Sequence, residues 1–165
     1  MQTIKMNKSL IVDEISTIIL EIIEENKDVT NLNKDSIKFC DENLSKIEVK
    51  KYIHRLSKYC QFQDSTLILA LIYCDRFCEM QEIKLQIINF HKIFLLSIVS
   101  AIKYNEDIYY RNSFYARIGG ITLKCISDLE RLFLDLLEFS LYVDEDMYEK
   151  YQNFVQIIEE SYKKI

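Results

Sequence analysis

Residues 94–104 carry apolar or small side chains on almost every side of a helical projection. A helix that is apolar all round is typical of a buried core element, because no side of it is suited to face water. The pattern therefore predicts a central helix over residues 87–104, with the other helices packed around it. Lys103 is the charged residue at which the apolar run stops.

Residues 9–25 repeat isoleucine at helical spacing, which predicts a first helix with one apolar side. We expect Glu14, Glu21 and Glu24 to face away from that side. Because the polar face is acidic, a packed helix is favoured over a helix lying on a membrane surface. Residues 26–44 are polar and irregular, and we expect a linker packed over the domain surface.

Residues 46–60 predict a second amphipathic helix whose other sides are strongly basic. Its apolar side is expected to contain Val49, Tyr52, Ile53, Leu56 and Tyr59. Solvated side chains explain most basic helix faces, and the alternative is a site for an acidic or phosphorylated partner.

A third helix is predicted over residues 64–80, with Asp64 as its N-cap. It contains the longest uninterrupted apolar run, residues 67–74, which is far shorter than the roughly 20 residues of a membrane span. At its exit, Asp75 is expected to be buried and therefore paired. Neighbours on a helix point about 100° apart, so Arg55 or a lysine of the preceding helix is favoured over Arg76 as the partner.

Residues 105–121 predict a long ordered connection, and long ordered connections are often functional. Both glycines of the chain stand at 119–120, where we expect unusual backbone dihedrals. The aromatic side chains of this stretch either tie it to the core or recognise a partner, and both roles can coexist. They are Tyr109, Tyr110, Phe114 and Tyr115.

Thr122 is expected to cap a helix that runs to about Glu138. Glu130 falls within the apolar stripe of this helix, where a charge is costly unless it is paired. We therefore predict that Lys103 and Glu130 meet at one edge of the bundle and form a docking point. Asp144 is expected to cap a last helix, and its inward positions are predicted to be Met147, Tyr151, Phe154 and Ile158.

The composition favours a single all-α domain, because 165 residues contain no proline and only two glycines. The net charge of −5 argues against nucleic-acid binding. The five cysteines show no CxxC pair and follow no signal-peptide pattern, so we expect reduced thiols in a cytoplasmic or nuclear protein. No nucleophile–base pair, phosphate loop or metal-ligand spacing stands out, so no catalytic residue, metal, cofactor, small-molecule substrate or membrane contact is expected.

Four segments, in this order, resemble the cyclin box, and more specifically the P/U-type cyclins, the family of the fungal phosphate-pathway cyclin. The segment 109–120 is the most specific of them, because it is similar to the Y-x-N-x-x-Y-A-K-V-G-G loop of that type. The segments are LIYCDRF at 71–77, SAIKY at 100–104, YYRNSFYARIGG at 109–120 and LERLFLDLLEFSL at 129–141.

The resemblance implies an all-α fold with five helices around a central third one, plus an N-terminal helix. It places a single cyclin box at 46–142, between an N-terminal helix and linker at 1–45 and a completing C-terminal helix at 143–165. It also implies a non-catalytic regulatory subunit that binds a cyclin-dependent protein kinase. Such a subunit orders the mobile helix and activation segment of the kinase.

The resemblance also assigns roles to residues. Lys103 and Glu130 match the paired charges that engage the kinase helix, and Asp75 matches a buried aspartate. In two-box cyclins that aspartate pairs with an arginine whose position here is held by Lys46, which leaves the partner of Asp75 open. The apolar kinase contacts are matched by Tyr104, Leu134, Phe139 and Leu141.

Two other hypotheses remain open at this stage. A cyclin fold can serve as a scaffold that binds a partner other than a kinase. A purely structural helical protein would instead bury its tyrosines at 109–115 and leave no exposed apolar patch near Glu130.

Overall fold

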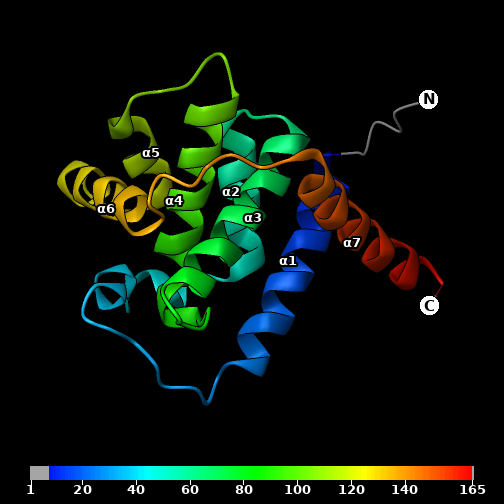
Figure 1. Cartoon of the computed structure of the whole chain (residues 1–165), viewed down its shortest axis with the longest axis horizontal. Coiled ribbons are helices and arrows are strands. Elements are labelled where there is room, and N and C mark those ends of the chain that lie inside the picture. Colours follow the sequence, from blue (N-terminus) through cyan, green and yellow to red (C-terminus); the bar gives the residue numbers. More distant parts are fainter. Residues whose placement is uncertain (1–7, 165) are drawn as a thin grey trace.

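A computed structural model describes residues 8–164, and this part of the chain is all-α, with no strand (Figure 1). Two short 3-10 helices, Ser36–Phe39 and Leu44–Lys46, lie in the segment between the first two α-helices. The seven α-helices are α1 (Lys8–Glu25), α2 (Val49–Cys60), α3 (Asp64–Met80), α4 (Ile87–Asn105), α5 (Asn112–Gly119), α6 (Leu123–Leu136) and α7 (Glu145–Lys163).

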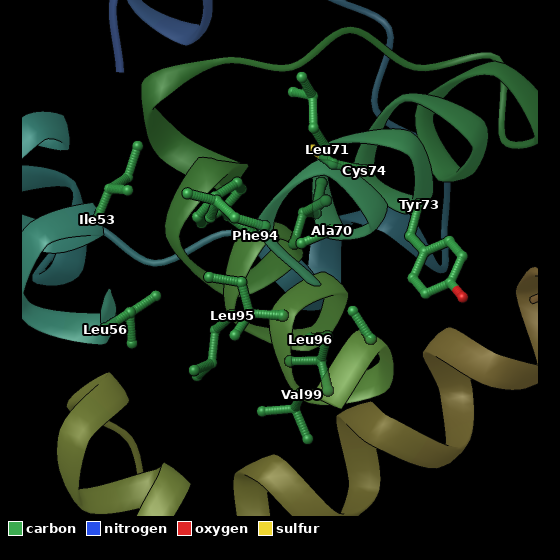
Figure 2. Close-up of a cluster of buried hydrophobic side chains, with 14 of the residues drawn as sticks. Ile53, Leu56, Ala70, Leu71, Tyr73, Cys74, Phe94, Leu95, Leu96 and Val99 are labelled. Atoms are coloured by element: carbon green, nitrogen blue, oxygen red, sulfur yellow. The ribbon is translucent and has the colours of Figure 1, made fainter. Parts of the chain in front are cut away.

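Helix α4 occupies the centre, as its all-round apolar pattern predicts. It packs against α2, α3, α5, α6 and both 3-10 helices, while α1 packs chiefly on α2 and α7 packs on α1 and α3. Figure 2 shows side chains of α2 and α3 gathered around Phe94, Leu95, Leu96 and Val99 of α4. By length and composition alone α4 could cross a membrane. However, 72% of its apolar 18-residue stretch is buried inside the fold, which is typical of a core helix.

The segment between α1 and α2 is packed on the domain, as expected. The Phe39 ring is fully buried and meets the Phe77 ring edge-on, with centroids 5.0 Å apart. Asp41 pairs with Lys92 of α4 at 3.2 Å and accepts hydrogen bonds from the backbone N–H groups of Asn43 and Leu44. Partial burial raises the pKa of Asp41, but these bonds outweigh it and the pKa lies below its usual value.

Helix termini follow the predicted caps at two positions of three. The Thr122 hydroxyl accepts from Cys125 N, and the Asp144 carboxylate accepts from Met147 N. Asp64, in contrast, is the first residue of α3 and not its cap. The carboxylate of Glu106, at the end of α4, accepts from Gln63 N and from the Thr66 hydroxyl, so a distant part of the chain caps α3.

Several predicted orientations are wrong. Glu14 is buried, Tyr59 is 46% exposed, and α7 turns Met147 and Phe154 towards solvent. Among the α7 side chains that the structure describes, Val155 is the fully buried one. Helix α7 packs mainly on α1 and α3, so a narrower stripe of it is covered than its sequence pattern suggests.

The stretch 105–121 is not an irregular connection throughout, because it contains α5. Its two glycines serve different purposes. Gly120 ends α5 with a φ of +75°, a left-handed conformation that favours glycine. Gly119 is needed for space, since a Cβ there would lie 2.3 Å from Cδ2 of the fully buried Leu95.

We expect Gly119→Ala to lower the free energy of unfolding by about 1–3 kcal/mol, because the added methyl group overpacks the core beside Leu95. Ser113→Ala, at an exposed position of the same helix, should change it by less than about 0.5 kcal/mol. Urea denaturation of both variants measures the difference, and equal stability of the two would contradict the packing explanation.

Candidate functional site

The two charges singled out in the sequence form an ion pair. Lys103 lies in the last turn of α4 and Glu130 in the middle of α6, and Lys103 Nζ is 2.6 Å from Glu130 Oε1. Their side chains are 28% and 16% exposed, so the pair sits at the edge of the fold and not inside the core. The predicted meeting of these residues is therefore observed.

Asn112, the first residue of α5, completes the pair into a closed ring of hydrogen bonds. Lys103 Nζ donates to Asn112 Oδ1 at 2.6 Å, and Asn112 Nδ2 donates to Glu130 Oε2 at 2.7 Å. This Lys103–Asn112–Glu130 ring joins α4, α5 and α6. Asn112 was not among the predicted site residues, although it is the asparagine of the matched Y-x-N motif.

The four predicted apolar contact residues differ in exposure. Tyr104 follows Lys103 directly and is 53% exposed, and Phe139, just beyond α6, is 65% exposed. Leu134 and Leu141 are half-buried. Large apolar side chains are therefore exposed directly after Lys103 and just beyond the helix that carries Glu130.

The segment that follows α6 is held in place by α3. Glu138 and Phe139 both have a φ of +53°, which turns the chain sharply after the helix. The Tyr73 hydroxyl donates to the backbone oxygen of Leu141 at 2.7 Å, and the Arg76 guanidinium donates to the carbonyls of Ser140 and Tyr142. Arg76 thus positions the segment that presents Phe139.

The aromatic residues of 109–115 divide between the two roles considered for them. Tyr115 is fully buried, and burial raises its pKa to about 12, so its hydroxyl stays protonated and accepts from Tyr110 N at 3.0 Å. Phe114 is half-buried, and its ring centroid lies 4.2 Å from that of Tyr110. Tyr109 is 56% exposed, so only part of the cluster ties α5 to the core.

Asp75 does not fit its prediction, because it is exposed and not buried. It accepts a hydrogen bond from the Tyr151 hydroxyl of α7. None of the candidate cations is its partner. Arg55 donates to the carbonyl of Arg117, Lys50 and Lys51 of α2 pair with Asp13 and Glu48, and no ion pair found within residues 8–164 includes Asp75 or Lys46. Helix α7, whose contacts the sequence did not reveal, supplies the partner instead.

The histidines and thiols do not form a further centre. His54 pairs with Asp13 at 2.8 Å, and buried His91 bonds to the carbonyl of Ile47. Within residues 8–164 no group of three or more His, Cys, Asp or Glu residues could hold a metal ion, and the five cysteines are free.

We expect Lys103 and Glu130 to be coupled by about 1–2 kcal/mol in a double-mutant cycle of Lys103→Ala and Glu130→Ala, because both charges are largely shielded from water. The exposed pair Lys124 and Asp128 on α6 is the control, and its coupling should be close to zero. Urea denaturation of the single and double variants gives both values. Similar coupling free energies in the two cycles would show that the Lys103–Glu130 pair is no stronger than an ordinary surface ion pair.

Comparison with known proteins places this geometry in a family. The sequence model of the family described as Cyclin matches residues 5–141. Cyclin-U2-1 of Arabidopsis thaliana is 29% identical over 86% of this chain and 66% of its own length. Cyclin-P3-1 of Oryza sativa subsp. japonica is 31% identical over 78% of this chain and 56% of its own.

PHO85 cyclin-7 of Saccharomyces cerevisiae is 28% identical over 87% of this chain and 54% of its own length. The chain thus spans between about half and two thirds of the length of these curated relatives. The family match covers α1 to α6 and the segment that presents Phe139, and only α7 lies outside it. With the Lys103–Asn112–Glu130 ring inside the matched region, the chain belongs to the cyclin family, and the relatives it matches include P- and U-type cyclins.

Proposed function

We propose that this protein is a regulatory subunit that binds a cyclin-dependent protein kinase and orders the mobile helix and activation segment of that kinase. The observation that carries the proposal is the Lys103–Asn112–Glu130 ring at an edge that also exposes Tyr104 and Phe139. Membership of the cyclin family supports it.

The ring is suited to hydrogen-bond a helix of another protein. An ammonium group has three donors, and Lys103 uses two of them within the ring. A carboxylate accepts about four hydrogen bonds, and Glu130 accepts two there. One donor and further acceptor sites therefore remain for a partner. Because the ring already fixes both side chains, the partner does not bear the entropic cost of ordering them.

The exposed aromatic residues supply the apolar part of the contact. Tyr104 follows Lys103 in the last turn of α4, and Phe139 lies just beyond the end of α6, the helix that carries Glu130. Large aromatic side chains that become buried at an interface contribute more binding energy than most other residues. A polar centre with apolar neighbours also fixes the register of a partner helix. A shifted helix would place an apolar side chain against Lys103 or Glu130, and that side chain could not form the hydrogen bond.

Such a surface would activate a kinase by preference for one of its conformations. A kinase is active when its mobile helix brings a glutamate to the lysine that orients the ATP phosphates. A subunit that binds this conformation more tightly than the inactive one shifts the population towards it. The cyclin then takes no part in the chemical step.

The test replaces both charges, in Lys103→Ala with Glu130→Ala, and compares the variant with Lys124→Ala combined with Asp128→Ala. Both variants lose one lysine and one acid, and the control pair lies on the exposed side of α6. The kinase is first identified by co-purification from the native cell. We expect the first variant to bind it at least about tenfold more weakly, as for an interfacial charge pair worth about 1.4 kcal/mol or more, and the control to bind normally.

Equal affinity of the two variants for the kinase would contradict the proposed docking site. Circular dichroism shows whether each variant keeps its helices. A kinase assay with added wild-type protein tests the function itself, since a scaffold would bind without raising phosphorylation, and that result would favour the alternative of a cyclin-fold scaffold.

A further inference from the structure

The segment that follows α6 has an uncommon backbone conformation. Glu138 and Phe139 are consecutive residues, and each has a φ of +53°, in the left-handed region that is unfavourable for a residue with a side chain. The bulky ring of Phe139 makes this conformation especially unfavourable there. Such a conformation persists only where the surrounding structure holds it. Other contacts must therefore stabilise the turn that presents Phe139.

Side chains of α3 bond to three successive carbonyls just beyond this turn. The Arg76 guanidinium donates to the carbonyls of Ser140 and Tyr142, to the latter at 3.2 Å. The Tyr73 hydroxyl donates to the carbonyl between them, that of Leu141, at 2.7 Å. Hydrogen bonds from a charged donor are stronger than those from a neutral one, so Arg76 contributes most to this clamp.

Tyr73, the other member of the clamp, is fixed by the core. Its ring is fully buried, and its hydroxyl points away from the cluster of apolar side chains (Figure 2). Burial raises the pKa of Tyr73, so the hydroxyl stays protonated and can donate. Asn105 Nδ2 donates to the Tyr73 hydroxyl oxygen at 3.4 Å. Because Asn105 ends α4, the clamp is connected to the turn that carries Lys103.

We propose that Arg76 is a positioning residue for the kinase contact: by holding Glu138 and Phe139 in the left-handed conformation, it presents Phe139 to the kinase in an ordered position. The inference rests on the proposed kinase-binding function and adds to it a residue that acts through Phe139. Without Arg76 the strained turn relaxes, and only a fraction of the molecules presents Phe139 correctly. The apparent Kd rises as that fraction falls.

A direct contact of the Arg76 charge with the kinase is the competing explanation. The guanidinium is half-buried and already bonds to two carbonyls, which favours the positioning role. The two explanations also differ in how substitutions combine. A direct contact would weaken binding equally with or without the Phe139 ring, whereas a positioning residue loses its effect once that ring is removed.

The first measurement uses the free full chain without the kinase. Amide hydrogen exchange, followed by NMR, reports how often the turn opens. We expect Arg76→Gln to speed exchange of the Phe139 and Ser140 amides about tenfold, because both bond back to carbonyls at the end of α6 only while the turn is formed. The control, Arg55→Gln, also removes a guanidinium–carbonyl bond, to Arg117, and should leave both rates unchanged.

The second measurement is the Kd for the kinase that co-purifies with the wild-type protein. We expect Arg76→Gln to raise this Kd about fivefold or more, but less than about twofold when Phe139→Ala is already present. Arg55→Gln should leave it within about twofold of the wild-type value. Arg76→Lys keeps the charge but loses the planar fork that reaches two carbonyls, so its Kd should be intermediate.

The third measurement tests whether strain is what Arg76 opposes. Glycine adopts the left-handed conformation without a steric cost. Glu138→Gly should therefore recover part of the affinity that Arg76→Gln loses, and it should slow exchange of the Phe139 amide in that background. A role of Arg76 in general stability would not be corrected by a glycine in this turn.

Three results would overturn the inference: unchanged amide exchange in Arg76→Gln, an equal rise in Kd with and without Phe139→Ala, or no recovery by Glu138→Gly. Circular dichroism shows whether each variant is folded. If the inference alone is wrong, Phe139→Ala weakens kinase binding and Arg76→Gln does not. If the proposed function is wrong, Phe139→Ala itself leaves the kinase affinity unchanged, which overturns the kinase role of both residues together.

Discussion

The burial of α4 on all sides is the constraint on which the rest of the structure depends. A helix with no polar face is stable only when other elements surround it, and here α2, α3, α5, α6 and the two 3-10 helices do so. Helix α5 packs so closely on α4 that there is no room for a Cβ atom at Gly119 beside Leu95. An apolar helix cannot extend beyond the elements that bury it. The last turn of α4 therefore lies at the edge of the fold.

At that edge, charged side chains are tolerated because they keep partial contact with water and find polar partners. The carbonyl end of a helix favours a cation, and Lys103 occupies the last turn of α4. The Glu130 carboxylate would be destabilising in the apolar stripe of α6 if it faced the core. It is tolerated because it bonds to Lys103 and Asn112. Three helices are thereby fixed to one another by polar contacts beside exposed aromatic residues. The same contacts that complete the packing also prepare a surface for a partner.

Features that depend on the local sequence pattern were predicted correctly. Features that depend on contacts with side chains far away in the sequence were not. The central helix, the caps at Thr122 and Asp144 and the meeting of Lys103 with Glu130 follow from periodicity and from the cost of an unpaired charge. The cap of α3 by Glu106 could not be predicted, because the two lie more than 40 residues apart. Likewise, the hydrogen bond from Tyr151 leaves Asp75 at the surface, and no periodicity reveals it.

Asp75 also shows how one short motif serves two sides of the molecule. On α3, Arg76 reaches the carbonyls after α6 and supports the segment that presents Phe139, whereas Asp75 points to α7. Neighbours on a helix diverge by about 100°, so adjacent residues can support two different surfaces without touching each other.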